Sequence, residues 1–280
     1  MTKPSIRRDQ VAGMNIHYIN YSFDYFLDAQ ERIGFKTIEL WCSSPHVWLD
    51  HMSYCDAKKI AKKIAEHGLK VHVLTPENCV YPYQYSAKEP EHVERTYGYF
   101  SNGIRLAEEL GCDSMEVNSG WGYWNEDKDE AWKRSRDMLS RLAEFAGEHG
   151  VTLAMEALRP EESQLVINIP TAQRMIEEVG SAHLKPMIDT CAMGVAGETI
   201  DQWFEAFDGD IRNVHFVDGT PYGHLIWGDG NHHLGEFIAA LNRHGYDRYL
   251  GQEITDEGYF TDPAKYDLRN MRNFERYIED

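Results

Sequence analysis

Basic residues are scarce in this chain of 280 residues. It has 28 Lys and Arg against 46 Asp and Glu, which gives a formal net charge of −18. Binding to nucleic acid needs clustered Lys and Arg to neutralise phosphates, and an anionic membrane surface attracts the same residues. The charge therefore argues against both partners. It says little about a neutral small molecule, because a local pocket can differ from the overall field.

Long apolar runs and paired cysteine motifs are also missing. No run approaches the length of a membrane span, and the first ten residues, MTKPSIRRDQ, lack the apolar stretch of a secretory signal. The five cysteines are odd in number, widely spread and without a CxxC motif, which argues against a disulfide framework or a cysteine zinc site. They are Cys42, Cys55, Cys79, Cys112 and Cys191. We therefore expect reduced thiols, a cytoplasmic location and no membrane contact.

Apolar runs rich in β-formers do alternate with longer amphipathic runs along the whole chain. With 42% hydrophobic residues the chain can bury a large core. The segment 56–67, DAKKIAKKIAEH, is a typical amphipathic helix, and a last helix is expected over 263–278. The eight expected strands are 11–18, 36–41, 70–74, 114–118, 152–157, 185–189, 213–217 and 249–254.

Five glycines mark junctions between a helical run and the next strand. Glycine just past a helix end fits the left-handed conformation that often terminates helices. The five are Gly34, Gly68, Gly111, Gly150 and Gly245. Eight βα units in 280 residues average 35 residues each. An open doubly wound sheet competes, but no GxGxxG follows the first strand, so we predict an α/β fold: a single (β/α)₈ TIM barrel domain over 1–280.

Four consecutive late strands each end in a side chain that can bind metal. These are Glu156, Asp189, His215 and Glu253. One acidic residue at a strand end is more often a helix N-cap or a surface acid. Three carboxylates buried together repel one another without a cation, and a barrel gathers its strand ends at one face. The set therefore predicts a site for one divalent ion, for which three carboxylates and one imidazole suit Mn²⁺, Co²⁺ or Mg²⁺.

At these segments the sequence resembles the sugar isomerase and epimerase superfamily with a xylose isomerase-like barrel. The motifs are MEALRPEES, KPMIDTCAM, VHFVDG and GQEITDEG, with ligand spacings of 33, 26 and 38 residues. The resemblance is strongest to ketose 3-epimerases. It implies that Glu156, Asp189, His215 and Glu253 bind one metal ion, most often Mn²⁺ and otherwise Co²⁺, Mg²⁺ or Ni²⁺. It also implies that Glu162 lies near the substrate, and that the protein is a homo-oligomer.

Within these epimerases, the segments LTPENCVYPYQYS and HFVDG…HLIWGDG look most like fructoselysine 3-epimerase. Two features of the tagatose and psicose enzymes are absent. Ala192 stands where they carry a substrate-binding His, and the loop DGTPYGHL lacks their Arg. The resemblance therefore implies a ketose larger than a free ketohexose, with His224 in part of the substrate-binding role.

The expected reaction inverts C3 of a ketose or ketosamine through a cis-enediolate. The resemblance implies that Glu156 and Glu253 both bind the metal and act as base and acid on opposite faces of the sugar. Glu39, Asn118 and Trp121 are further candidates for substrate binding. Nearby, His72 is expected inside the barrel without binding the metal, and Trp41 and Trp227 are candidates for pocket walls.

Other activities are compatible with the same metal site. A lyase that dehydrates a sugar or cleaves a C-glycoside shares the proton abstraction but expels a leaving group. An aldose–ketose isomerase moves a proton between C1 and C2. A metal-binding module without catalysis would tolerate loss of Glu162, and the DNA-cleaving branch of the superfamily is opposed by the net charge.

Overall fold

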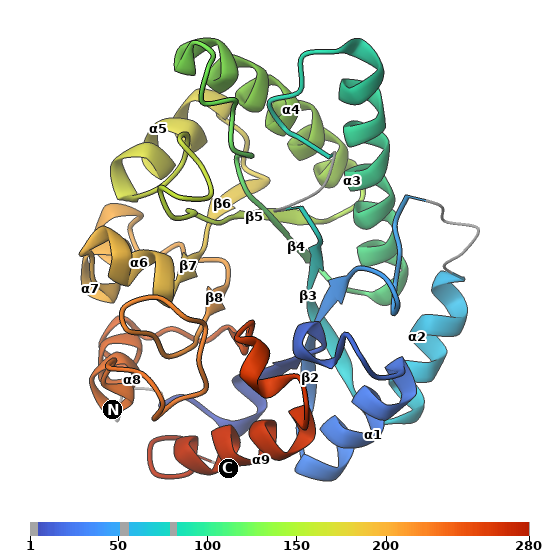
Figure 1. Cartoon of the computed structure of the whole chain (residues 1–280), viewed down its shortest axis with the longest axis vertical. Helices are drawn as coiled ribbons and strands as arrows, with labels where there is room; N and C mark the ends of the chain where they lie inside the picture. The colour runs from blue at the N-terminus through green and yellow to red at the C-terminus, as the bar shows by residue number, and fades with distance from the viewer. Residues whose placement is uncertain (1–4, 51–55, 79–82, 280) are drawn as a thin grey trace.

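Parallel strands form a ring that is surrounded by helices (Figure 1). The computed structural model describes residues 5–50, 56–78 and 83–279. The strands are β1 Val11–Met14, β2 Thr37–Cys42, β3 Lys70–Pro76, β4 Ser114–Val117, β5 Thr152–Met155, β6 Leu184–Pro186, β7 Ile188–Asp189, β8 Val214–His215 and β9 Leu250–Gly251. The helices are α1 Phe23–Ile33, α2 Ala57–Glu66, α3 Pro90–Leu110, α4 Lys128–Glu148, α5 Ile169–Val179, α6 Thr190–Ala196, α7 Ile200–Ala206, α8 Leu234–His244 and α9 Pro263–Phe274.

The ring closes through a divided strand. The strand order is β6-β5-β4-β3-β2-β1-β9-β8-β7, so β6 and β7 stand at the two ends of the sheet although they follow each other in the chain. They are halves of the expected strand 185–189, separated at Met187. The Met187 N–H donates to the Met155 carbonyl at 3.0 Å, and the Ile188 N–H donates to the Asn213 carbonyl at 3.1 Å. One segment thus bonds to both neighbours, and the predicted TIM barrel is confirmed.

Capping residues set the helix ends as the sequence predicts. Asp56 accepts a hydrogen bond from the Lys59 backbone N–H at 3.0 Å and begins α2. Gly34 ends α1 with φ of 97°, a left-handed conformation that costs glycine little. All five predicted junction glycines have positive φ. At these five junctions the helix ends at or just before the glycine, and the chain turns into the next strand.

The first and last predicted elements are too long. The expected strand 11–18 ends at Met14 and continues as a 3-10 turn, Ile16–Tyr18. Asn15 causes the change, because its side chain accepts from the Trp41 N–H at 2.8 Å and donates to the Trp41 carbonyl at 2.9 Å. These bonds replace the backbone pairing that a continued strand would make. The final helix ends at Phe274 rather than at residue 278.

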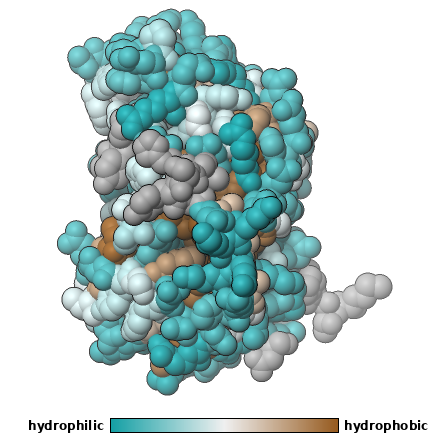
Figure 2. Space-filling view, turned by 90° about the vertical axis from the view of Figure 1, so that its right-hand side faces the viewer, coloured by the Kyte–Doolittle hydropathy of each residue, from teal (hydrophilic) through white to brown (hydrophobic). Residues whose placement is uncertain are grey.

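Buried apolar side chains from strands and helices form the main core between the ring and its covering helices. Leu40 of β2, Leu106 of α3 and Leu142 of α4 are fully buried members of it. Figure 2 shows that the face on the α2 and α3 side is largely hydrophilic, with hydrophobic residues in the furrows. In the described part of the chain, no helix has the length and apolar character needed to span a membrane.

Candidate active site

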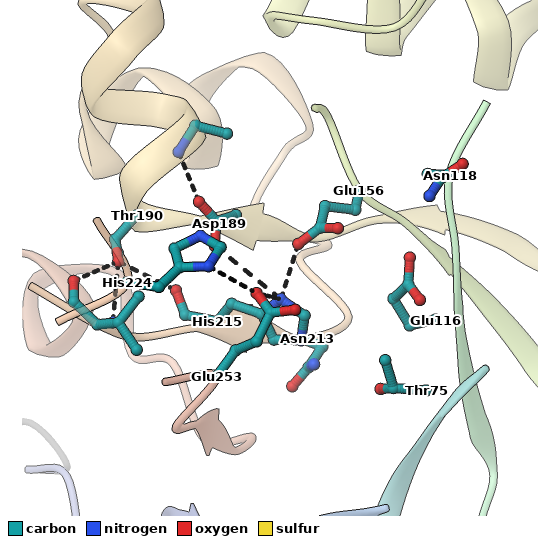
Figure 3. Close-up of polar contacts among 12 residues, drawn as sticks. Thr75, Glu116, Asn118, Glu156, Asp189, Thr190, Asn213, His215, His224 and Glu253 are labelled. Atoms are coloured by element: carbon teal, nitrogen blue, oxygen red, sulfur yellow. Dashed lines mark hydrogen bonds and ion pairs between the residues drawn. The ribbon is translucent and has the colours of Figure 1, made fainter. Parts of the chain in front are cut away.

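Four side chains meet at the carboxyl ends of the late strands (Figure 3). Glu156 directly follows β5, Asp189 ends β7, His215 ends β8, and Glu253 lies two residues beyond β9. The Nδ1 atom of His215 is 2.7 Å from Glu156 Oε1, 3.1 Å from Glu253 Oε2 and 4.0 Å from Asp189 Oδ2. One potential ligand atom from each residue lies within 4.8 Å of all the others. The predicted set is therefore brought together.

Burial makes the charges of this group interdependent. Burial raises the pKa of Glu156 to about 7, although the nearby His215 works in the opposite direction. Burial alone would lower the pKa of His215, but Glu253, Glu39 and Glu156 outweigh it and raise that pKa well above its usual range. In the metal-free protein, a protonated imidazole thus compensates part of the carboxylate charge.

Asp189 directs one carboxylate oxygen at the group. Its Oδ1 caps α6 by accepting from the Ala192 N–H at 2.5 Å. Its Oδ2 is buried and, among the described residues, accepts no hydrogen bond, although His224 Nε2 lies 3.2 Å away as an ion partner. A buried carboxylate oxygen usually has a donor or a cation. This oxygen, two further carboxylates and one imidazole nitrogen fit a divalent cation.

A second group, Asp189, Cys191 and His224, has the right atom types but unsuitable chemistry. A thiol binds metal as a thiolate. Burial raises the pKa of Cys191 far above its usual range, and its thiol donates to the Asp218 carbonyl at 3.3 Å. The group around His215 is therefore the better cation site.

The loop between β8 and α8 carries His224 and is organised by one carboxylate. Asp218 is fully buried and accepts from the backbone N–H groups of Gly228 at 2.9 Å, Gly230 at 2.9 Å and His232 at 3.0 Å. It also pairs with Leu225 through two backbone hydrogen bonds. The short segment between Asp218 and Leu225 is thereby folded toward the site.

His224 reaches the metal-competent group from this loop. Its Nε2 lies 3.2 Å from Asp189 Oδ2, and its Nδ1 lies 3.5 Å from Glu253 Oε2 and 3.0 Å from Thr255 Oγ1. The residue has a φ of 44°, a strained value outside glycine that tertiary contacts must hold. Although burial disfavours the charged ring, Asp189 and Glu253 raise the pKa of His224 to about 9.

A cavity next to the group is lined by residues of the β5–α5 and β8–α8 loops, of α6 and of the group itself. Glu162, Ala192 and His224 contribute to it, as sequence analysis anticipated. Arg159 and Tyr222 line it as well and were not anticipated. The Arg159 guanidinium binds Glu162 at 2.9 and 3.1 Å and lies 3.3 Å from the centre of the Tyr222 ring. An arginine thus does reach the cavity, from the β5–α5 loop, and its proximity to Glu162 in RPEE was the available signal.

Glu39, an expected contact of the substrate, does not line the cavity beside the group. Glu39 has no exposed surface, and its Oε1 lies 2.9 Å from His215 Nε2 on the side away from the carboxylates. Trp121 lines a separate hollow beside Gln84 and Ser86. Asn118 is buried at the end of β4, where its Oδ1 accepts from the Gly120 N–H at 2.8 Å.

The aromatic and histidine candidates outside the group have packing roles. Trp41 donates its indole N–H to Glu77 at 3.1 Å, and Trp227 donates to the Phe216 carbonyl at 3.1 Å within the core. His72 is buried inside the barrel and bonds to the Ile38 carbonyl at 3.0 Å. Neither tryptophan lines the cavity near His215.

Glu116 of β4 is an acid that sequence analysis overlooked. It is buried, and its Oε2 accepts from the Asn78 amide at 3.1 Å. Burial, reinforced by Glu156, raises the pKa of Glu116 well above its usual range. The alternation in SMEVN places Glu116 and Asn118 on the same face of the strand, which was the signal for an interior acid.

Residues 27–275 match the xylose isomerase-like TIM barrel family. The chain belongs to this family. It is 27% identical over 252 residues to fructoselysine 3-epimerase of Shigella flexneri, covering 89% of this chain and 90% of that protein. It is 26% identical over 266 residues to D-psicose 3-epimerase of Enterocloster bolteae, covering 85% and 82%.

Solved structures agree on the fold. The D-psicose 3-epimerase of Clostridium cellulolyticum H10, crystallised with D-tagatose, superimposes with a TM-score of 0.77 at 14% identity. The alignment covers 96% of this chain and 100% of that one. The superfamily resemblance recognised in the sequence is thus confirmed.

Proposed function

We propose that the protein is a metal-dependent epimerase that inverts C3 of a ketose or ketosamine. The observation that carries the proposal is the placement of Glu156 and Glu253 on either side of His215, within a set of atoms that fits a divalent cation. The relatives named as fructoselysine and D-psicose 3-epimerases support the reaction type.

Epimerisation at C3 removes one proton and returns one to the opposite face. In the proposed reaction one of the two glutamates takes the C3 proton, and the other donates a proton from the far side of the resulting enediolate. Their roles exchange for the reverse reaction. Glu156 and Glu253 follow β5 and β9, which are not neighbours in the ring, so their carboxylates can flank a sugar. A bound divalent cation, Mn²⁺ by resemblance, would supply Lewis-acid polarisation of the C2 carbonyl.

The residues around the cavity favour a substituted ketose as the substrate. Ala192, smaller than the histidine of the tagatose and psicose enzymes, lines the cavity, and Arg159 with Glu162 presents one positive and one negative group beside it. A ketosamine with a charged amino-acid substituent has matching groups. We therefore propose that such a compound reacts with higher kcat/KM than free psicose or tagatose.

Deuterium exchange tests the function directly. The Mn²⁺-loaded protein is incubated in D₂O with psicose, tagatose, fructose and a fructosamine of lysine, and the products are read by NMR. We expect solvent deuterium at C3 of an epimerised product, with fastest turnover of the substituted ketose. Label at C1 or C2 would indicate an aldose–ketose isomerase, and a released aglycone or water would indicate a lyase. Either result, or no exchange with any ketose, would contradict the proposal.

Two broader expectations also stay predictions. The resemblance implies a homo-oligomer, which sedimentation analysis of the purified protein would reveal. The scattered cysteines and the acidic surface favour a cytoplasmic location, which fractionation of the source cells would test.

A further inference from the structure

A buried carboxylate supports His215 from behind. His215 Nδ1 faces Glu156 and Glu253, while its Nε2 faces Glu39 Oε1 at 2.9 Å. Glu39 and His215 both have no exposed surface. Because the two ring nitrogens point in opposite directions, the imidazole connects the cavity with a carboxylate that no substrate can touch.

Glu39 is itself held by its neighbours. The Thr75 hydroxyl donates to Glu39 Oε1 at 2.6 Å, and the Asn213 amide lies 3.3 Å from Oε2. On the strand beside His215, Gly251 leaves the space that the carboxylate occupies: a Cβ added there would overlap Glu39 Oε2. The carboxylate is therefore fixed in place against Nε2 of His215.

We propose that Glu39 is a positioning residue that prepares His215 to bind the cation through Nδ1. A neutral imidazole carries one proton, and the nitrogen without it supplies the lone pair to a metal. A carboxylate at Nε2 accepts that proton in a hydrogen bond, so Nδ1 is left for the cation and the ring cannot turn away. The inference rests on the proposed metal site but not on the identity of the sugar.

A matched pair elsewhere in the chain provides the control. His17 Nε2 lies 2.8 Å from Asp267 Oδ1, and both side chains are buried. Tyr18 and Gln30 also donate to this carboxylate, at 2.6 and 2.7 Å. The pair joins the turn after β1 to α9 and, within the described part of the chain, belongs to no group of potential metal ligands. Removing its charge tests the general effect of disturbing a buried acid–histidine pair.

The experiment measures Mn²⁺ affinity by calorimetry in metal-free wild-type, Glu39→Gln and Asp267→Asn protein. Loss of a carboxylate behind a ligating histidine typically weakens metal binding by about 10- to 100-fold. We expect such a loss for Glu39→Gln. Asp267→Asn should lower the melting temperature while its Mn²⁺ affinity stays within about twofold of wild type. Thr75→Val, which removes the hydroxyl that donates to Glu39 Oε1, should weaken Mn²⁺ binding in the same direction and serves if Glu39→Gln does not fold.

A double-mutant cycle shows whether Glu39 acts through His215. In a His215→Ala background, Glu39→Gln should change the remaining Mn²⁺ affinity by less than about twofold, because the ring to be positioned is gone. An equal loss in both backgrounds would mean that Glu39 acts only as a distant charge and would overturn the inference. Unchanged affinity in folded Glu39→Gln would overturn it too. If wild-type protein binds Mn²⁺ but places no label at C3, the proposed function fails while the positioning role stands.

Discussion

Glu156 and Glu253 present their carboxylates to one cavity from either side of the strand that carries His215. Replacing either residue with Gln keeps an oxygen for the cation but removes the group that carries the proton. We expect each variant to lose at least about 10²-fold in kcat, the scale of a positioned acid or base. Turnover should be measured on protein whose metal content has been determined.

A half-buried glutamate outside the site is the control for these variants. Glu198 accepts from the Trp203 indole at 3.0 Å and from the Ile169 N–H at 2.9 Å, so Glu198→Gln disturbs packing without touching the cavity. It should retain wild-type kcat. A metal-loaded Glu156→Gln variant within about tenfold of wild type would contradict the assignment of Glu156 as an acid–base group.

His224 predicts a pH dependence of stability in the metal-free protein. Asp189 and Glu253 face its ring, with Glu156 farther off and the Tyr222 ring beside it, and together the acids raise its pKa to about 9. Because the unfolded value is lower, near 6.5, this stabilisation is complete below about pH 6.5 and is lost as the pH rises through 9. Urea unfolding in chelator should show that the wild-type protein loses more stability over this interval than His224→Gln. Parallel pH profiles would refute the ion pair.

A side chain's place could be predicted from the sequence where the local pattern sets its position, and not where packing between distant segments does. Glu156 and Asp189 occupy strand ends, whose position follows from periodicity and from the barrel rule. Arg159 lies in a loop, and its place over Tyr222 depends on how two separate loops pack. Glu39 lies within the predicted strand 36–41, yet its partner is 176 residues away in the chain. Only the closed ring shows that Glu39 contacts His215.

At the scale of elements, the β8–α8 loop depends on Asp218. Replacing it with Asn puts an amide N–H where the carboxylate accepts from Gly228 and Gly230. Hydrogen bonds to a buried charged group contribute about 1.5–3 kcal/mol each, so Asp218→Asn should lower the free energy of unfolding by at least about 2 kcal/mol. It should also weaken substrate binding, because His224 is held by the same loop. Denaturant unfolding and KM measure the two effects.

A nearby acid provides the comparison for that loop. Asp229 binds Arg269 and accepts from the Tyr259 hydroxyl at 2.9 Å, but its side chain is 31% exposed. Asp229→Asn should therefore cost no more than about 1 kcal/mol, as for ion pairs near the surface. Equal losses for the two variants would show that Asp218 does not organise the loop.

Element boundaries were predictable where local chemistry decides them. Asp56 and the junction glycines act within one turn of the helix they bound, and the structure places those ends as predicted. The break at Met187 was not predictable, because it arises from bonding to β5 on one side and to β8 on the other. The early end of β1 has the same kind of origin, since Asn15 bonds to Trp41 of another strand.

For the whole molecule, metal binding should raise the free energy of unfolding. An ion that binds only the folded state at 100 times its Kd adds about 2.7 kcal/mol to the free energy of unfolding. Chelator should therefore lower the melting temperature, and Mn²⁺ should restore it together with activity. His215→Ala should show a smaller response at the same Mn²⁺ concentration, because it keeps only part of the affinity. Active, as-purified protein without any divalent ion would contradict the proposed metal dependence.

The divided strand has a consequence for how the barrel holds its shape. β7, β8 and β9 are each two residues long, whereas β2 has six and β3 seven, so this arc of the wall is built from the shortest strands. Asp189, His215 and Glu253 rise from this arc, and Glu156 faces them from the far side of the break. An ion bound by all four residues would cross-link the barrel wall where its strands are shortest. The same ion would then serve both the reaction and the closure of the ring. In the metal-free protein, strands β7 to β9 would separate before the rest of the barrel.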